Sequence, residues 1–512
     1  MTNLDITDPP SGQRLRDNVA TLRHHGRADQ RLYYSVSMLQ RQGHALERAE
    51  KVYRILSDES LTTPEGRAAE ICALRDHCRT LATLAQEAVD SIADHVVDCI
   101  PGRNDTSELQ RNLLWHFEAD LRRIAREVLD DAGVDGAKWM VVEEYYNQAS
   151  KPDGVLSSDL YYDSVDGGAG RFPADTERRR NREWVDFWIR ALHGCPGGPT
   201  LFHPPADWQD WSHCPSKLFR TYDSHSTGTN NPIVIASLLS ESGAQKSRDD
   251  LLGLPAGDAA ILLHKHLNNA AFDSDNLSSW TSSLLFAIQY AIYRCDRFRL
   301  SPSDVSICVL DPADFPRGQF MRDMTLIRAY REHIVSEFFD FRLNRDDYNN
   351  GEYLSQGRVY IARRSCVATL AQLEQAGLYE LYPQYADAHG KKQWTNRVLD
   401  LRALWSIRKP TTTMAETETA LRIAKKCFPR FGAADMALML LAFRNCPLNG
   451  AGLEDSGFAE DHAASQYGPV EVDRYRALLV KAEEIRKDDN GLFSDEDLLR
   501  KIYLCAEDEE TI

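Results

Sequence analysis

The stretch that decides the fold is Leu277-Ser-Ser-Trp-Thr-Ser-Ser-Leu-Leu-Phe-Ala-Ile-Gln-Tyr-Ala291. Its first half is rich in hydroxyl side chains and predicts a short β-strand, on which Ser279 and Thr281 share one face because side chains alternate along a strand. Ser282 or Ser283 then caps a predicted helix. Apolar residues recur in that helix at helical spacing: Leu284, Ala287, Ile288 and Ala291. A strand that runs directly into a helix indicates an α+β unit.

The sequence around this stretch alternates β-like runs with helical patterns from Ser216 to Tyr385. Strands are expected at Lys217–Tyr222, Ile233–Ala236, Val305–Leu310 and Glu352–Ile361, and helices at 258–269 and 283–296. The segment is therefore predicted to be one mixed domain.

Helical periodicity dominates the rest of the chain. One apolar stripe runs from Leu109 to Val128, and a capping box is expected at Asp105 and Glu108. Later helices are expected at Ala415–Cys427, Ala433–Arg444, Val470–Arg486 and Ser494–Cys505, the last capped by Ser494 with Asp497.

A cluster of proline and glycine between Pro196 and Pro205 marks a boundary between the first helices and the segment that follows. We therefore expect an α+β fold in which a central mixed β domain (206–385) is flanked by an N-terminal helical domain (1–205) and a C-terminal helical domain (386–512).

The composition excludes several classes of protein. Of the 512 residues, 43% are hydrophobic and 27% charged, which is typical of a globular protein. A net charge of −17 disfavours nucleic acid as a partner. The longest apolar run, Met436 to Phe443, is too short to span a membrane, and no apolar signal segment is evident, so a cytoplasmic location is expected.

No metal site is expected. The 11 cysteines include no CxxC pair, and their scatter is typical of reduced thiols. His264 and His266 lie two residues apart on a predicted helix, so their side chains should point in different directions.

Three short motifs carry candidate chemistry. Arg220 ends the run Lys217-Leu-Phe-Arg, and its guanidinium can bind a phosphate or ribose oxygens. Ser279 places a hydroxyl on the predicted strand before the helix. Glu352 begins the strand Glu352-Tyr-Leu-Ser-Gln-Gly-Arg-Val-Tyr-Ile361. Read separately, each has a plain structural interpretation: an edge-strand arginine, turn chemistry and a solvated strand end.

Taken in order, Arg220, Ser279 and Glu352 resemble the arginine–serine–glutamate triad of ADP-ribosyltransferases. Leu218-Phe219-Arg220 is similar to that family's first strand, and Ala287 follows Ser279 at the family's spacing. The stretch, about one third of the chain, also looks like an uncharacterised domain of filamentous-fungal proteins that is thought to be related to the same fold.

The resemblance implies an NAD-consuming enzyme, either a mono-ADP-ribosyltransferase or an NAD glycohydrolase, with NAD as substrate. Glu352 would be catalytic and would stabilise the cationic ribose. Arg220, Ser279, Thr281 and Tyr222 would bind NAD. The ADP-ribose acceptor, a protein or a small molecule, stays open.

The sequence also departs from the family pattern. Trp280 follows Ser279 where the family has a threonine, and it could narrow a ribose pocket. Asn350 stands where arginine-modifying transferases carry a second glutamate. The alternative hypothesis is a catalytically inactive scaffold or interaction protein that keeps the transferase-like fold.

Overall fold

The computed structural model describes most of the chain after residue 105. The described residues are 106–132, 138–151, 153–165, 174–205, 208, 214–241, 249–268, 275–345, 348–407, 411–446, 448, 468–488 and 494–503, with isolated positions between 72 and 83. The chain divides into two compact units, Met1–Gly198 and Pro199–Ile512. The division falls inside the predicted proline- and glycine-rich boundary.

The described part of the first unit is helical. Its helices are α4 (Glu108–His116), α5 (Glu118–Ala132), α6 (Lys138–Ser150), α7 (Ser158–Val165) and α8 (Ala174–Gly194).

The start of α4 differs from the expected capping box. Asp105 lies outside the described residues, and the N-cap is Ser107, whose side chain accepts from the backbone N–H of Gln110 while Gln110 bonds back to Ser107. The predicted stripe is divided between α4 and α5 at the buried Phe117.

The second unit contains a six-stranded sheet in the order β6-β7-β4-β1-β5-β9. The strands are β1 (Leu218–Tyr222), β4 (Leu277–Thr281), β5 (Ser306–Leu310), β6 (Met321–Arg322), β7 (Glu352–Gln356) and β9 (Ser365–Thr369). Every recorded pairing of this sheet in the described part is antiparallel, and the sheet together with its helices confirms the expected α+β class.

A second, three-stranded sheet has the order β2-β3-β8, with β2 at Thr229–Asn230, β3 at Val234–Ala236 and β8 at Arg358–Tyr360. The single strand expected at Glu352–Ile361 is therefore two strands in different sheets. Gly357 separates them with a φ of 62°, a left-handed conformation that favours glycine.

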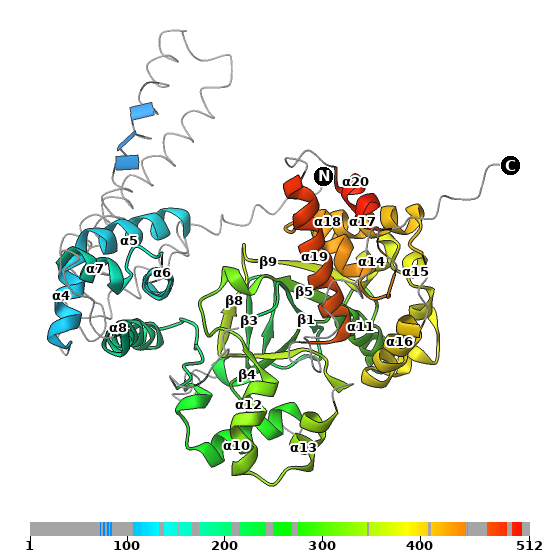
Figure 1. Ribbon diagram of the computed structural model, residues 1–512, viewed down its shortest axis with the longest axis horizontal. Helices are drawn as coiled ribbons and strands as arrows, with labels where there is room; N and C mark the ends of the chain where they lie inside the picture. The colour runs from blue at the N-terminus through cyan, green and yellow to red at the C-terminus, as the bar shows by residue number, and fades with distance from the viewer. Residues whose placement is uncertain are drawn as a thin grey trace, which may run out of the picture. The chain divides into compact units, whose positions relative to one another are not determined.

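Helices cover one face of the large sheet in two groups. α10 (Ala256–Leu267), α12 (Asp323–Tyr330) and α13 (Glu337–Asn344) enclose a core with Leu277 and Leu354. α11 (Leu284–Phe298) covers Phe219, Ile307 and Val309. The opposite face packs on the small sheet through residues such as Leu218, Trp280 and Val359. Figure 1 shows the first helical group at the lower end of this unit.

The remaining helices of this unit are α9 (Leu238–Glu241), α14 (Leu370–Ala376), α15 (Leu378–Leu381), α16 (Thr395–Ile407), α17 (Met414–Cys427), α18 (Ala433–Leu441), α19 (Val470–Asp488) and α20 (Asp495–Ile502). α17 to α20 confirm the helices expected there. Ser494 caps α20 by accepting from the N–H of Asp497, as expected.

The C-terminal helices share one hydrophobic core with the large sheet. Phe219 of β1, Leu421 of α17 and Leu438 of α18 belong to the same buried cluster. The described helices of residues 386–512, a range expected as a separate domain, therefore pack in the same compact unit as the sheet. Burial of this apolar surface stabilises the sheet and the helices together.

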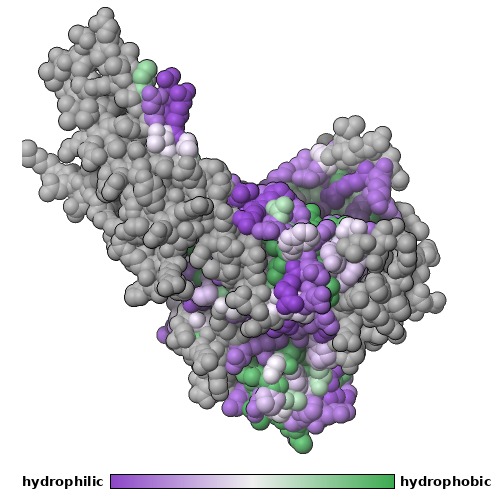
Figure 2. All heavy atoms as spheres, turned by 90° about the vertical axis from the view of Figure 1, so that its left-hand side faces the viewer, coloured by the Kyte–Doolittle hydropathy of each residue, from purple (hydrophilic) through white to green (hydrophobic). Residues whose placement is uncertain are grey.

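The described helices include none that is long and apolar enough to cross a membrane. Figure 2 shows apolar side chains among polar ones at the lower end of the molecule, where α10, α12 and α13 lie. Ile261, Val335 and Phe341 are exposed there. The described cysteines are free thiols, as expected.

A buried ion pair between Arg402 and Glu471 joins α16 to α19, and a hydrogen bond from Ser283 connects it to the start of α11. Glu471 is 3% exposed and accepts from Arg402 at 2.8 and 3.0 Å and from the Ser283 hydroxyl at 2.5 Å. Burial opposes ionisation of Glu471, but the Arg402 charge and these hydrogen bonds hold its pKa below the usual 4.5.

We expect Arg402→Met to lower the free energy of unfolding by about 3–5 kcal/mol, because the charge of Glu471 is then buried without its partner. Urea unfolding measures the change. The double substitution Arg402→Met/Glu471→Leu should lower the free energy of unfolding less than Arg402→Met alone.

Lys425→Met is the matched control, since Lys425 pairs with Glu496 on the surface and its loss should cost less than about 1 kcal/mol. Equal losses for the two single variants would contradict a stabilising role of the buried pair.

Candidate functional site

The strand register places the three predicted residues on two faces of the large sheet. Phe219 pairs with Thr281, and Thr281 pairs with Glu352. Directly paired residues share a face, and successive residues alternate. Ser279, Thr281 and Glu352 therefore lie on the helix-covered face. Arg220 leaves β1 on the opposite face, toward the small sheet.

Ser279 and Glu352 are diagonal neighbours on that helix-covered face. Ser279 pairs with Leu354, two residues after Glu352 on β7. Diagonal residues on adjacent antiparallel strands lie about 7–8 Å apart, within reach of one small ligand. The structure thus brings two of the three predicted side chains onto one surface.

Arg220 nevertheless contacts Ser279 directly. Its Nη1 donates to the Ser279 carbonyl at 2.7 Å, and its Nε donates to Asn230 Oδ1 at 2.9 Å. The ladder between β1 and β4 has a single residue pair, Phe219 with Thr281. The bond from Arg220 to the Ser279 carbonyl joins the two strands beyond that pair.

The Arg220 cation is bound by neutral groups. Both acceptors are uncharged, and in the described part of the chain no carboxylate bonds to it. Burial lowers the pKa of the Arg220 guanidinium to about 10. A guanidinium held in this way is suited to an anionic ligand, because such a ligand would supply the missing opposite charge.

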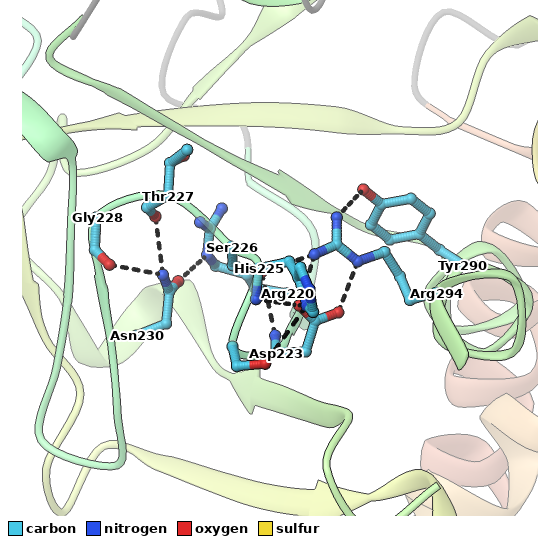
Figure 3. A network of polar contacts seen from close by, with 10 residues as sticks. Arg220, Asp223, His225, Ser226, Thr227, Gly228, Asn230, Tyr290 and Arg294 are labelled. Atoms are coloured by element: carbon cyan, nitrogen blue, oxygen red, sulfur yellow. Dashed lines mark hydrogen bonds and ion pairs between the residues drawn. The ribbon is translucent and has the colours of Figure 1, made fainter. Parts of the chain in front are cut away.

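A second arginine shapes the loop beside Arg220. Arg294 of α11 binds Asp223 with two bonds of 2.6 Å and donates to the Tyr290 hydroxyl at 3.3 Å. Asn230 is fixed by the carbonyls of Thr227 and Gly228. Figure 3 shows that these groups surround Arg220. The loop after β1 is thus held against α11 by a charge-assisted contact.

The Ser279 hydroxyl contacts a histidine that itself contacts a carboxylate. His266 Nε2 lies 2.9 Å from Ser279 Oγ, and His266 Nδ1 lies 2.8 Å from Asp275 Oδ2. Asp275 Oδ1 also accepts from the Leu277 N–H at 2.9 Å. His264 points elsewhere and packs edge-on against Phe339, as its spacing from His266 predicts.

Glu352 belongs to an ionic cluster. Arg342 of α13 donates to Glu352 Oε2 at 3.3 Å and also bonds Asp323, which is fully buried. The Glu352 side chain remains 21% exposed. Two oxygens of this region, Asp323 Oδ1 and Asn350 Oδ1, are buried without a hydrogen-bond partner among the described residues.

The other predicted residues have structural contacts. The Thr281 hydroxyl donates to the Asn350 carbonyl at 2.6 Å and accepts from the Ser283 N–H at 3.0 Å. Tyr222 lies in the core between the sheets, where burial raises its pKa to about 12. In the described part of the chain, neither the Thr281 nor the Tyr222 side chain forms a hydrogen bond to the side chain of Arg220, Ser279 or Glu352.

Trp280 does not narrow the surface around Ser279. It points to the opposite face, is 2% exposed, donates to Ser355 Oγ at 2.9 Å and packs against Phe320. Alternation along β4 turns the indole away from the Ser279 hydroxyl, so Trp280 does not enclose that hydroxyl.

Four residues of this region were missed in the sequence: His266, Asp275, Asp323 and Arg342. For the pair His266 and Asp275 the sequence offered one signal: Asp275 lies two residues before the hydroxyl-rich strand, and His266 lies near the end of the predicted helix that precedes it. Asp323 and Arg342 had none, because the helices that carry them did not show a clear apolar period. No described group of His, Cys, Asp and Glu side chains is arranged to hold a metal ion.

One of the comparisons with known proteins finds a match, and it covers the sheet region of the second unit. A family model described as "Domain of unknown function (DUF7587)" matches residues 213–371. No curated protein and no solved structure matches the chain. The matched range contains Arg220, Ser279 and Glu352.

The buried carboxyl of Asp323 gives the site a pH dependence. Burial, together with the charge of Glu352, raises the pKa of Asp323 to about 6 although Arg342 opposes the shift. The folded protein therefore binds this proton near pH 6, whereas the unfolded chain binds it near the ordinary value of 3.8. Binding of this proton stabilises the folded protein. The stabilisation is complete below pH 3.8 and is lost as the pH rises through about 6.

We expect the native protein to gain stability relative to Asp323→Asn as the pH falls from about 7 to about 5. Urea unfolding of both proteins across this range measures the difference, because all other titrating groups are shared. A difference that is constant with pH, or that shrinks toward acid, would contradict the raised pKa.

Proposed function

We propose that the second unit binds NAD and cleaves the bond between nicotinamide and ribose, as an ADP-ribosyltransferase or an NAD glycohydrolase. The observation that carries the proposal is the position of Ser279, whose carbonyl accepts from Arg220 and whose side chain shares a face with Glu352. The resemblance of these motifs to the arginine–serine–glutamate transferases supports the same reading.

Arg220 would bind the phosphates of NAD. Its charge is held by two neutral acceptors, and its Nη2 makes no hydrogen bond within the described residues. A diphosphate would accept from this nitrogen and neutralise a cation whose pKa burial has lowered. Loss of such a charge-assisted bond costs about 1.5–3 kcal/mol.

Glu352 would stabilise the reacting sugar. When the glycosidic bond breaks, its electron pair leaves with nicotinamide and positive charge develops on the ribose. A carboxylate beside the ribose stabilises that charge.

The acceptor of ADP-ribose is water or a nucleophile other than arginine. Asn350 occupies the position at which arginine-modifying relatives carry a second carboxylate. An amide has no negative charge with which to bind and deprotonate a guanidinium. Hydrolysis of NAD is the simplest reaction consistent with this replacement.

A second candidate is a catalytically inactive domain that serves as a scaffold. The observation that favours it is the ion pair between Arg342 and Glu352, because the carboxylate is already neutralised by a residue of the same chain. Placement of Arg220 and Glu352 on opposite faces of the sheet favours it as well. The two candidates differ in whether the protein binds NAD.

We expect the native protein to release nicotinamide from NAD and Glu352→Gln to do so about 100-fold or more slowly, because the charge that stabilises the ribose is gone. Liquid chromatography of the released nicotinamide measures both rates. Glu337→Gln, an exposed position on α13, is the matched control and should retain the native rate.

Equal rates for the native protein and Glu352→Gln would remove Glu352 from the mechanism. No nicotinamide release, together with no heat of NAD binding in calorimetry, would favour the scaffold.

Arg220→Met should weaken NAD binding about 10-fold or more, since a charge-assisted bond to phosphate is lost. Calorimetric titration with NAD measures the dissociation constant. Arg297→Met removes an exposed arginine of α11 and should leave it unchanged. Unchanged binding by Arg220→Met would show that this cation does not contact the dinucleotide.

A further inference from the structure

Three side chains at the end of α10 and the start of β4 form one hydrogen-bonded chain. Asp275 Oδ2 lies 2.8 Å from His266 Nδ1, and His266 Nε2 lies 2.9 Å from Ser279 Oγ. Both distances are those of well-formed hydrogen bonds. Neither His266 nor Asp275 takes part in the proposed cleavage of NAD.

The carboxylate fixes the direction of the protons. An ionised Asp275 only accepts, so His266 Nδ1 carries the hydrogen. In the neutral imidazole Nε2 then has a lone pair, and the Ser279 hydroxyl must donate to it. Asp275 is itself held by the Leu277 N–H at 2.9 Å, so the ring orientation has support from the backbone.

The three hydrogen-bonded side chains are partly accessible to solvent. The His266 and Asp275 side chains are 14% and 13% exposed. Ser279 is partly exposed, whereas its neighbours Ser278 and Trp280 are buried. The three side chains are therefore not fully enclosed, in contrast to the core residues on either side of Ser279.

We propose that Ser279 is a base-activated nucleophile that attacks carboxylic esters, with His266 as its general base and Asp275 as the residue that positions His266. A hydroxyl within hydrogen-bond reach of a base, and a base oriented by a third group, is the arrangement that activates serine. It is recognised by geometry rather than by order along the chain.

The reaction balances with the ester and water alone. Ser279 Oγ bonds to the ester carbonyl carbon while its proton passes to His266 Nε2. The alcohol then leaves with that proton, which gives an acyl-Ser279. Water attacks the acyl carbon, gives its proton to His266 and releases the carboxylic acid, and the proton returns to Ser279.

The other hydroxyls of this strand and its turn differ in their contacts. Ser283 donates to the carboxylate of Glu471 at 2.5 Å, and Thr281 donates to a backbone carbonyl. Neither group is a base that takes up a proton near neutral pH, because one is a carboxylate of lowered pKa and the other is a peptide oxygen. Among the three, only Ser279 has a histidine as its acceptor.

The test is labelling of the full chain with a fluorophosphonate probe in the absence of NAD, followed by mass spectrometry of the labelled peptide. We expect the native protein to carry the label on Ser279. His266→Gln should slow labelling about 100-fold or more, because the base is removed. Native protein without label, or labelled at another residue, would overturn the proposal whatever the variants do.

Two further variants separate chemistry from packing. Asp275→Asn retains an oxygen for the Leu277 N–H but removes the charge beside His266, so it should also slow labelling. His264→Gln changes a histidine of the same helix that packs on Phe338 and Phe339, and it should label at the native rate. A rate for His266→Gln equal to that of His264→Gln would overturn the role of His266.

Turnover of p-nitrophenyl acetate gives an independent readout. We expect a rapid release of one p-nitrophenol per chain that is absent in Ser279→Ala. An unchanged release in Ser279→Ala would overturn the assignment of Ser279 as nucleophile. Because both assays omit NAD, their outcome does not depend on whether the protein cleaves NAD.

Discussion

The hydrogen bond from Arg220 to the Ser279 carbonyl, 2.7 Å long, is the contact on which the arrangement of the site depends. It joins β1 to β4 where their ladder has a single residue pair. The guanidinium is half-buried, and within the described residues both of its hydrogen-bond acceptors are neutral. A side-chain bond in place of backbone pairing keeps the two strands together and still leaves Arg220 able to bind an anion.

The two faces of β4 separate structural and chemical roles. Trp280 faces the small sheet and fills the core there, while Ser279 faces the helices and contacts His266. Alternation along the strand allows one short segment to do both, since neighbouring residues never compete for the same space.

The sequence was sufficient for the elements whose pattern is local. The strand-to-helix stretch from Leu277, the hydroxyl face shared by Ser279 and Thr281, and the cap at Ser494 all follow from spacing and capping chemistry, and the structure confirms them. The pairing of distant segments could not be predicted from the sequence. The face on which Arg220 lies depends on the register of β1 against β4, which has no local signal. The contact of Arg342 with Glu352 depends on the packing of α13, which has no local signal either. The continuity of the C-terminal helices with the core of the sheet also depends on tertiary contacts, which an apolar helix stripe does not specify.

The direction of the Ser279 hydroxyl constrains both proposals. Its single proton is used by His266, so toward any ligand Ser279 offers only lone pairs. It can accept from a ribose hydroxyl, or it can attack an electrophilic carbon, but it cannot donate to a phosphate or a carbonyl while the chain to Asp275 is intact. The permanent donor bonded to this residue is Arg220, which donates to the Ser279 carbonyl. The lone pairs of Ser279 and the cation of Arg220 lie on opposite faces of the sheet, and the two residues are joined through the Ser279 carbonyl.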